Sequence, residues 1–312
     1  MTSADLTSID ANPCPPGAEA KIVRNGDAEL RVARWMPEGA KSTVILAHGR
    51  TEFIEKYYEV IGELLARGFA VFSFDWRGQG MATRELETWQ RGHIENFNDY
   101  LTDLDAIFTD EFFEATPGPR YVIAHSMGGN IMLRYLHDHP ELAERAVFSA
   151  PMLQIGGAIA GSAIRLLAMG AISAGQAGEE PFVSKPVDPI EDTFDGNAVT
   201  SDPARFARTR KTVEANPRLG LAGISWQWVK AAIDSIEVTW TDEFIAGVNV
   251  PTLFVAAGRE RIVDPTACNR FAKASKVCET VTIEGTLHEI MMEKDHFRRQ
   301  FWALFDEFIS RP

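Results

Sequence analysis

The stretch YVIAHSMGGN, residues 121–130, joins a strand pattern to a helix pattern with almost no turn between them. Its first four residues are apolar or aromatic and suit a buried strand, and the amphipathic sequence NIMLRYLHDH (130–139) follows as a helix. The corner holds Ser126 and two glycines, Gly128 and Gly129. A glycine in a helix costs about 1 kcal/mol relative to alanine, so the pair needs a physical reason.

Two interpretations of this corner are open. Ser126 could cap the helix, which serine commonly does. Alternatively, small neighbours let the helix approach the strand closely and lift the serine hydroxyl clear of the backbone, as in the nucleophile elbow G-x-S-x-G. Ala124 occupies the first position of that pattern, and alanine is still small. The buried strand before Ser126 and the helix after it favour the nucleophile.

Strand and helix patterns alternate on both sides of the corner. After two strands at 21–26 and 28–37, short apolar runs occupy 43–49, 69–74, 120–126, 144–151, 251–258 and 278–285. Helical patterns occupy 57–68, 96–115, 130–139, 265–275 and 295–310. This alternation predicts an α/β fold with a mostly parallel central sheet, built from βαβ units and flanked by helices.

The alternation stops between about residues 152 and 242, where helical and loop patterns carry no buried strand. An insertion of ~90 residues is too long for a loop. We therefore predict a core formed by 21–151 and 243–312, interrupted by a helical segment at 152–242, here called the cap segment. Residues 1–20, rich in proline, alanine and polar side chains, are predicted to form a flexible arm.

Composition narrows the classes of function. Among 312 residues, 31 are basic and 44 acidic, a net charge of −13 that argues against nucleic-acid binding. Three cysteines form no CxxC pair, which favours a reducing compartment. The N-terminus has no basic start followed by an apolar run, so we expect no signal peptide and a cytoplasmic location. No HExxH or clustered His/Cys spacing appears, so we expect no metal and no cofactor.

A serine nucleophile needs a base, and the base needs an orienting acid. Beyond a nucleophile elbow, the partners follow in the order acid, then histidine. His288 comes directly after the last strand pattern, at the edge where ligands bind. The acid should lie in GRERIVDP, which offers Glu260 and Asp264. Asp264 precedes a proline and a helix and has an alternative role as a helix cap, so we favour Glu260.

The oxyanion of acyl transfer needs preorganised N–H donors. One should be the main-chain N–H of Met127, the residue after the serine. The second should come from HGRTEF (48–53), which follows an earlier strand, and the expected donor there is the main-chain N–H of Arg50.

Five motifs now stand in a familiar order: LAHGRTEF, FDWRGQG, AHSMGG, GRERIVD and EGTLHEI. From about Lys21 onward the chain resembles α/β-hydrolases, most of all the bacterial lysophospholipase and monoacylglycerol lipase branch, which shares motifs with proline iminopeptidase-like serine aminopeptidases. The resemblance implies the α/β-hydrolase fold, with Ser126 as nucleophile, His288 as base and a lipid ester as the small-molecule substrate. The chain departs from many relatives in carrying Glu260 where they have aspartate.

By the same resemblance, the cap segment is a lid inserted after the fourth parallel strand. Its residues 155–175 carry one charge and approach the ~20 residues of a membrane span, but five glycines favour a lid helix over an apolar pocket. We expect Leu167, Trp226 and Trp228 to contact an acyl chain. The alternative is that these aromatics only pack the cap against the core. The basic cluster at 204–211 could touch lipid headgroups in a transient membrane-surface contact, or be a solvated helix face.

The leading interpretation is a serine hydrolase that cleaves lysophospholipid or monoacylglycerol esters. One alternative is an aminopeptidase, with Glu179, Glu180, Glu191 and Asp192 available to bind a substrate ammonium; another is an esterase for small esters. A third is a non-catalytic ligand-binding module that kept the fold. The sequence sets no oligomeric state.

Overall fold

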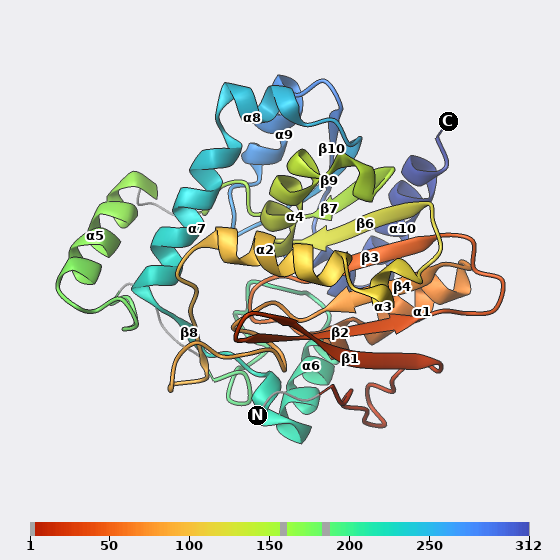
Figure 1. The fold of residues 1–312 in the computed structure, drawn as a ribbon, viewed down its shortest axis with the longest axis horizontal. Coiled ribbons are helices and arrows are strands. Elements are labelled where there is room, and N and C mark those ends of the chain that lie inside the picture. Colours follow the sequence, from red (N-terminus) through yellow and green to blue (C-terminus); the bar gives the residue numbers. More distant parts are fainter. Residues whose placement is uncertain (1–3, 157–160, 183–187, 312) are drawn as a thin grey trace.

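The strand that leads into the serine corner, β6 (Arg120–His125), lies inside the central sheet, and its last four residues are fully buried. It pairs in parallel with β3 (Thr43–Ala47) on one side and β7 (Arg145–Ser149) on the other. These relations come from a computed structural model that describes residues 4–156, 161–182 and 188–311 (Figure 1). Because both faces of β6 are covered, its continuous apolar run is the expected sequence.

In the described part of the chain, the main sheet has eight strands in the order β1-β2-β4-β3-β6-β7-β9-β10. The first two are antiparallel to their neighbours, and the strands from β4 to β10 pair in parallel. The remaining strands are β1 (Ala18–Asn25), β2 (Ala28–Trp35), β4 (Ala70–Phe74), β9 (Thr252–Ala257) and β10 (Cys278–Ile283). The predicted mostly parallel α/β fold is confirmed.

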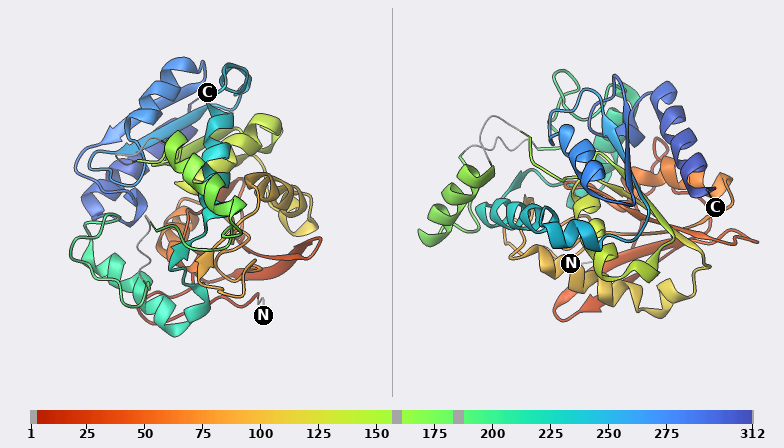
Figure 2. Two further views of the ribbon diagram at one scale, coloured as in Figure 1. Left: turned by 90° about the vertical axis from the view of Figure 1, so that its left-hand side faces the viewer. Right: turned by 90° about the horizontal axis from the view of Figure 1, so that it is seen from above.

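Helices cover both faces of the sheet and form two apolar cores (Figures 1 and 2). One core packs α1 (Tyr58–Ala66) and α10 (Asp295–Ile309) against the sheet. The other packs α2 (Phe97–Phe108), α4 (Met127–Asp138), α8 (Asp242–Gly247) and α9 (Thr266–Ala274) on the opposite face. The carboxyl ends of the parallel strands, where the predicted site residues stand, are left free for loops.

Between β7 and β9 the chain forms α5 (Gly161–Ser173), α6 (Pro203–Ala215) and α7 (Trp226–Thr239). A short strand, β8 (Gly223–Ile224), pairs with β5 (Arg91–Gly92) outside the main sheet. Helix α5 lies alongside α7 and away from the sheet (Figures 1 and 2). None of the described helices is both long and apolar enough to cross a bilayer.

Two local expectations differ from the structure. The helix predicted over 96–115 ends at Phe108, and a separate short helix α3 (Glu111–Glu114) follows. The side chain of Asp110 accepts a hydrogen bond from the N–H of Phe112 and so caps a new helix, which the continuous apolar periodicity did not indicate.

The N-terminal residues predicted as a flexible arm lie against the body of the protein in their described part. Asn12 is buried, and its amide donates to the carbonyl of Glu55 (2.8 Å) and to the hydroxyl of Thr212 in α6 (3.2 Å). Strand β1 begins at Ala18, so residues 18–20 belong to the sheet and not to the arm. Composition alone could not reveal partners this distant in sequence.

Candidate active site

Ser126 occupies the sharp corner between β6 and α4. Its backbone angles are φ 51° and ψ −117°, a region that non-glycine residues rarely adopt. Such strain costs on the order of 1–3 kcal/mol and persists only where the surrounding fold imposes it. Although Ser126 stands directly before the helix, its side chain makes no capping hydrogen bond. The hydroxyl instead lies 2.9 Å from Nε2 of His288.

The two glycines of the corner are required by close packing. A Cβ on Gly128 would lie 2.4 Å from the carbonyl oxygen of His48, and one on Gly129 would lie 2.8 Å from the Cβ of Pro151. Neither contact is tolerable, since backbone and ring atoms cannot move aside cheaply. The first turn of α4 therefore approaches the neighbouring strand ends as the sequence pattern predicted.

His288 follows β10 at the same edge of the sheet and is buried, with 4% of its surface exposed. Its Nδ1 lies 2.7 Å from Oε2 of Glu260, and its Nε2 faces the hydroxyl of Ser126. Because a carboxylate can only accept, Nδ1 carries the proton and Nε2 is free to accept the proton of the serine. Serine, histidine and glutamate thus form one continuous hydrogen-bonded chain.

The second carboxylate oxygen of Glu260 is held by main-chain N–H groups. Its Oε1 accepts the main-chain N–H groups of Arg261 (2.9 Å) and Ile262 (2.8 Å). Burial pushes the pKa of Glu260 upward, but the hydrogen bond and charge of His288, with these N–H groups, bring that pKa below its ordinary value. Glu260 is therefore ionised where His288 needs it.

The alternative acid, Asp264, points elsewhere. Its Oδ1 accepts from the N–H and hydroxyl of Thr266 at the start of α9, and its Oδ2 pairs with Arg270 at 3.0 Å. The structure brings Glu260 to His288 and leaves Asp264 in the capping role that its place before a helix suggested.

The predicted oxyanion donors lie on two neighbouring loops. Neither the N–H of Met127 nor that of Arg50 donates to an acceptor within the described residues. The loop that carries Arg50 is held by Glu52, whose Oε2 accepts from the N–H of Gly49 (2.5 Å) and the hydroxyl of Tyr57 (2.8 Å). Two N–H groups are thus left available in a rigid setting.

A buried ion network, which the sequence reasoning missed, connects this loop to the histidine loop. Nζ of Lys56 lies 2.9 Å from Oε1 of Glu52 and 2.6 Å from Oε1 of Glu289, the residue after His288. Burial lowers the pKa of Lys56, but the two carboxylates more than offset this and raise it above its ordinary value. The only sequence signal was the i,i+4 spacing of Glu52 and Lys56; the partner 233 residues away had none.

The residues predicted to contact an acyl chain lie on helices α5 and α7 of the cap segment. Leu167, on α5, is 43% exposed. Trp226 and Trp228 are buried, and the Trp228 ring packs 5.9 Å from that of Phe97 in α2. Both tryptophans therefore pack α7 against its surroundings, and their contact with an acyl chain stays a prediction.

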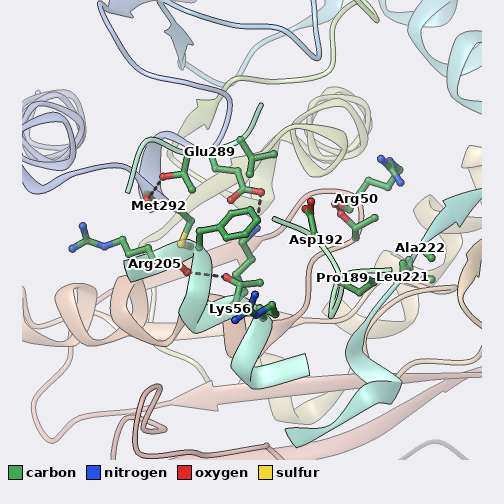
Figure 3. A pocket seen from close by; sticks show the side chains of 15 residues that line it. Arg50, Lys56, Pro189, Asp192, Arg205, Leu221, Ala222, Glu289 and Met292 are labelled. Carbon is green, nitrogen blue, oxygen red and sulfur yellow. Dashed lines mark hydrogen bonds and ion pairs between the residues drawn. The ribbon is translucent and has the colours of Figure 1, made fainter. Parts of the chain in front are cut away.

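A cavity of about 280 Å³ lies beside the site (Figure 3). Its wall includes Arg50 and Thr51 of the predicted oxyanion loop, together with Glu289, which follows His288.

Among the described residues, no group of three or more histidine, cysteine, aspartate or glutamate side chains is arranged to hold a metal ion.

His125, directly before the serine, gives the site a pH-dependent contribution to stability. Burial lowers the pKa of His125 to about 4, below the ordinary value of ~6.5 in the unfolded chain. The unfolded state therefore binds this proton first as the pH falls, and stability is lost between about pH 6.5 and 4. Between pH 7 and pH 4.5, the free energy of unfolding of the unmodified protein, measured in urea, should fall by roughly 2–3 kcal/mol more than that of His125→Asn.

The comparison isolates the histidine, because all carboxylates titrate in both proteins. An asparagine amide can still donate to the carbonyl of Ser149, which Nδ1 of His125 meets at 3.0 Å. Equal pH dependence of the two proteins would contradict the assignment.

A parallel α/β sheet whose strand ends bring together serine, histidine and glutamate defines a serine hydrolase of the α/β-hydrolase fold. The chain belongs to the family described as serine aminopeptidase, S33, whose sequence profile matches residues 38–295.

Individual relatives agree with this assignment. The chain is 29% identical to lysophospholipase L2 of Escherichia coli, over 94% of this chain and 87% of the relative. It is 25% identical to the monoacylglycerol lipase of Mycolicibacterium smegmatis, over 84% and 86%. In fold, it resembles the monoglyceride lipase of Saccharomyces cerevisiae, with a TM-score of 0.71 at 19% identity, covering 94% of this chain and 96% of that one.

Proposed function

We propose that the protein hydrolyses carboxylic esters of lipids, a lysophospholipid or a monoacylglycerol, through an acyl-enzyme formed on Ser126. The observation that carries the proposal is the chain of hydrogen bonds from the Ser126 hydroxyl through His288 to Glu260, at 2.9 and 2.7 Å. The names of the relatives, lysophospholipase and monoacylglycerol lipase, support the lipid substrate.

In the proposed reaction, Oγ of Ser126 attacks the ester carbonyl while Nε2 of His288 takes its proton. Glu260 stabilises the imidazolium through Nδ1. The N–H groups of Met127 and Arg50 bind the oxyanion. His288 then protonates the alcohol as it leaves, and water, activated by the same histidine, releases the fatty acid and restores the serine.

Chain length provides the test of a lipid substrate. Each methylene moved from water into an apolar site gains roughly 0.8 kcal/mol, nearly fourfold in binding. We therefore expect kcat/KM on p-nitrophenyl esters to rise with chain length from acetyl toward dodecanoyl until the site is full. A flat profile would contradict a lipid substrate and favour the small-ester esterase. Leu167→Asp, which tests the predicted acyl contact, should lower activity on dodecanoyl esters more than on acetyl esters.

The family name keeps an aminopeptidase as the second candidate. Of the carboxylates available for a substrate ammonium, Glu179 pairs with Arg91 at 3.1 Å, which weakens its case. Amino-acid p-nitroanilides measured beside the esters separate the candidates, because an aminopeptidase would cleave the anilides preferentially. The non-catalytic alternative predicts no labelling by a fluorophosphonate probe.

A lipid substrate also implies contact with a lipid surface. We propose that the cap segment makes this contact transiently. Exposed apolar side chains support it: Leu166 and Met169 on α5 are 69% and 40% exposed, and Phe182 is 76% exposed.

A further inference from the structure

The cavity beside the site contains one cation that forms no ion pair with a residue that the structure describes. Four cationic side chains line it, and three of these have a carboxylate oxygen close by: Lys56 at 2.6 Å, Arg205 at 2.6 Å and Arg210 at 3.3 Å. The fourth, Arg50, has no side-chain hydrogen bond or ion pair with any residue that the structure describes. Burial lowers the pKa of Arg50, but a guanidinium remains charged at neutral pH.

Arg50 is held in place by an aromatic ring. Its guanidinium carbon lies 5.6 Å from the ring centroid of Trp228, which is buried at the start of α7. In Figure 3, the Arg50 side chain points away from Lys56 and Arg205. Glu52 attracts this charge and opposes the effect of burial on the pKa of Arg50, but no carboxylate oxygen of the described residues forms an ion pair with the guanidinium.

The cavity borders both the predicted oxyanion loop and the residue that follows His288. In acyl transfer, the histidine delivers its proton to the departing alcohol, so that alcohol has to lie beside His288. Glu289, the next residue, forms part of the cavity wall, as do Arg50 and Thr51 of the predicted oxyanion loop. A volume of about 280 Å³ lies just below the roughly 300–1,000 Å³ of sites for whole drug-sized ligands, which suits a polar head better than a full acyl chain.

We infer that this cavity binds the phosphate-bearing head group of a lysophospholipid, with the guanidinium of Arg50 donating to the phosphate. The inference rests on the proposed function and chooses between its two lipid classes. A planar guanidinium matches phosphate oxygens in charge and geometry, whereas the glycerol of a monoacylglycerol offers it no anion.

The carboxylate of Asp192 indicates which kind of head group the cavity would prefer. It is the one carboxylate of the cavity wall that has no ion-pair partner in the described part of the chain, and its Oδ1 accepts only the N–H of Thr193 at 2.9 Å. A head group that carries an ammonium beyond its phosphate meets both free charges, so a zwitterionic head should bind better than an anionic one.

The experiment compares three dodecanoyl esters in mixed micelles of a neutral detergent: lysophosphatidylethanolamine, lysophosphatidylglycerol and monoacylglycerol. We expect Arg50→Met to lower kcat/KM for both phospholipids, relative to the monoacylglycerol, at least tenfold. Any disturbance of the loop affects all three esters and cancels in the ratio. Asp192→Asn should lower only the ethanolamine-to-glycerol ratio. Lys276→Met, which removes an exposed cation outside both the cavity wall and the basic cluster at 204–211, should change neither ratio.

A second readout does not depend on lipid cleavage. Glycerophosphoethanolamine should competitively inhibit p-nitrophenyl acetate hydrolysis by the unmodified protein, and Arg50→Met should raise the inhibition constant at least tenfold. If no lipid is cleaved but this inhibition holds, the proposed function fails while the head-group site stands. Unchanged ratios in Arg50→Met, or no inhibition of the unmodified protein, would overturn the site.

Discussion

Replacing Ser126 with alanine should lower kcat for ester hydrolysis by about a thousandfold or more, while the protein still folds. The hydroxyl is the group that faces Nε2 of His288, and without it no acyl-enzyme can form. The measurement is kcat on the p-nitrophenyl ester that the unmodified protein cleaves fastest. Labelling by a fluorophosphonate should disappear in the same variant.

A second buried serine provides the matched control. Ser149, at the end of β7, is fully buried, and its main-chain oxygen accepts from the N–H of Ser126. Its hydroxyl makes no hydrogen bond to His288, so Ser149→Ala should retain turnover within a fewfold. Undiminished hydrolysis by Ser126→Ala would show that another group is the nucleophile.

The second large effect is expected for Glu260→Gln, on the order of a thousandfold to ten-thousandfold in kcat. Glutamine can still accept N–H groups from the following residues, so stability should change little. It cannot stabilise an imidazolium, and its amide can donate to Nδ1 of His288, which favours the wrong tautomer. The measurement is kcat and KM on the same ester, with the loss expected in kcat.

Asp264→Asn is the control for the acid. Asparagine caps a helix about as well as aspartate, and it keeps an oxygen for the N–H of Thr266 at the start of α9. Its turnover should therefore stay within a fewfold of the unmodified protein. If Asp264→Asn lowered kcat about a thousandfold and Glu260→Gln did not, Asp264 would be the acid.

The local parts of the site could be read from the sequence because neighbouring residues determine them. The corner at Ser126 needs small residues within three positions, and Gly128 and Gly129 meet backbone and ring atoms that leave no room for a Cβ. His288 and Glu260 each lie in the loop that follows a strand, and parallel strands end at one edge of the sheet. Because both loops lie at this edge, the sequence predicts that Ser126 and His288 meet, although 162 residues separate them.

Contacts between elements that are distant along the chain produce no recognisable pattern in the sequence. Trp226 and Trp228 are both buried, and the contact of the Trp228 ring with Phe97 in α2 follows from no pattern in the sequence. Composition gives the area that a side chain can bury but not the surface that covers it. The same limit applies to Asn12, whose buried partners lie on distant segments.

The sequence by itself determined the α/β sheet, the serine corner, and the histidine and acid loops, since each follows from short-range sterics and hydrophobic periodicity. Only the tertiary structure decided that Glu260 meets His288 while Asp264 turns to α9, and that Lys56 bridges Glu52 and Glu289. It also decided that Arg50, in the cavity wall, forms no ion pair with a described residue. The physical reason is that a charge is compensated through space: its partner is whichever group the fold brings within a few ångströms, at any distance along the chain.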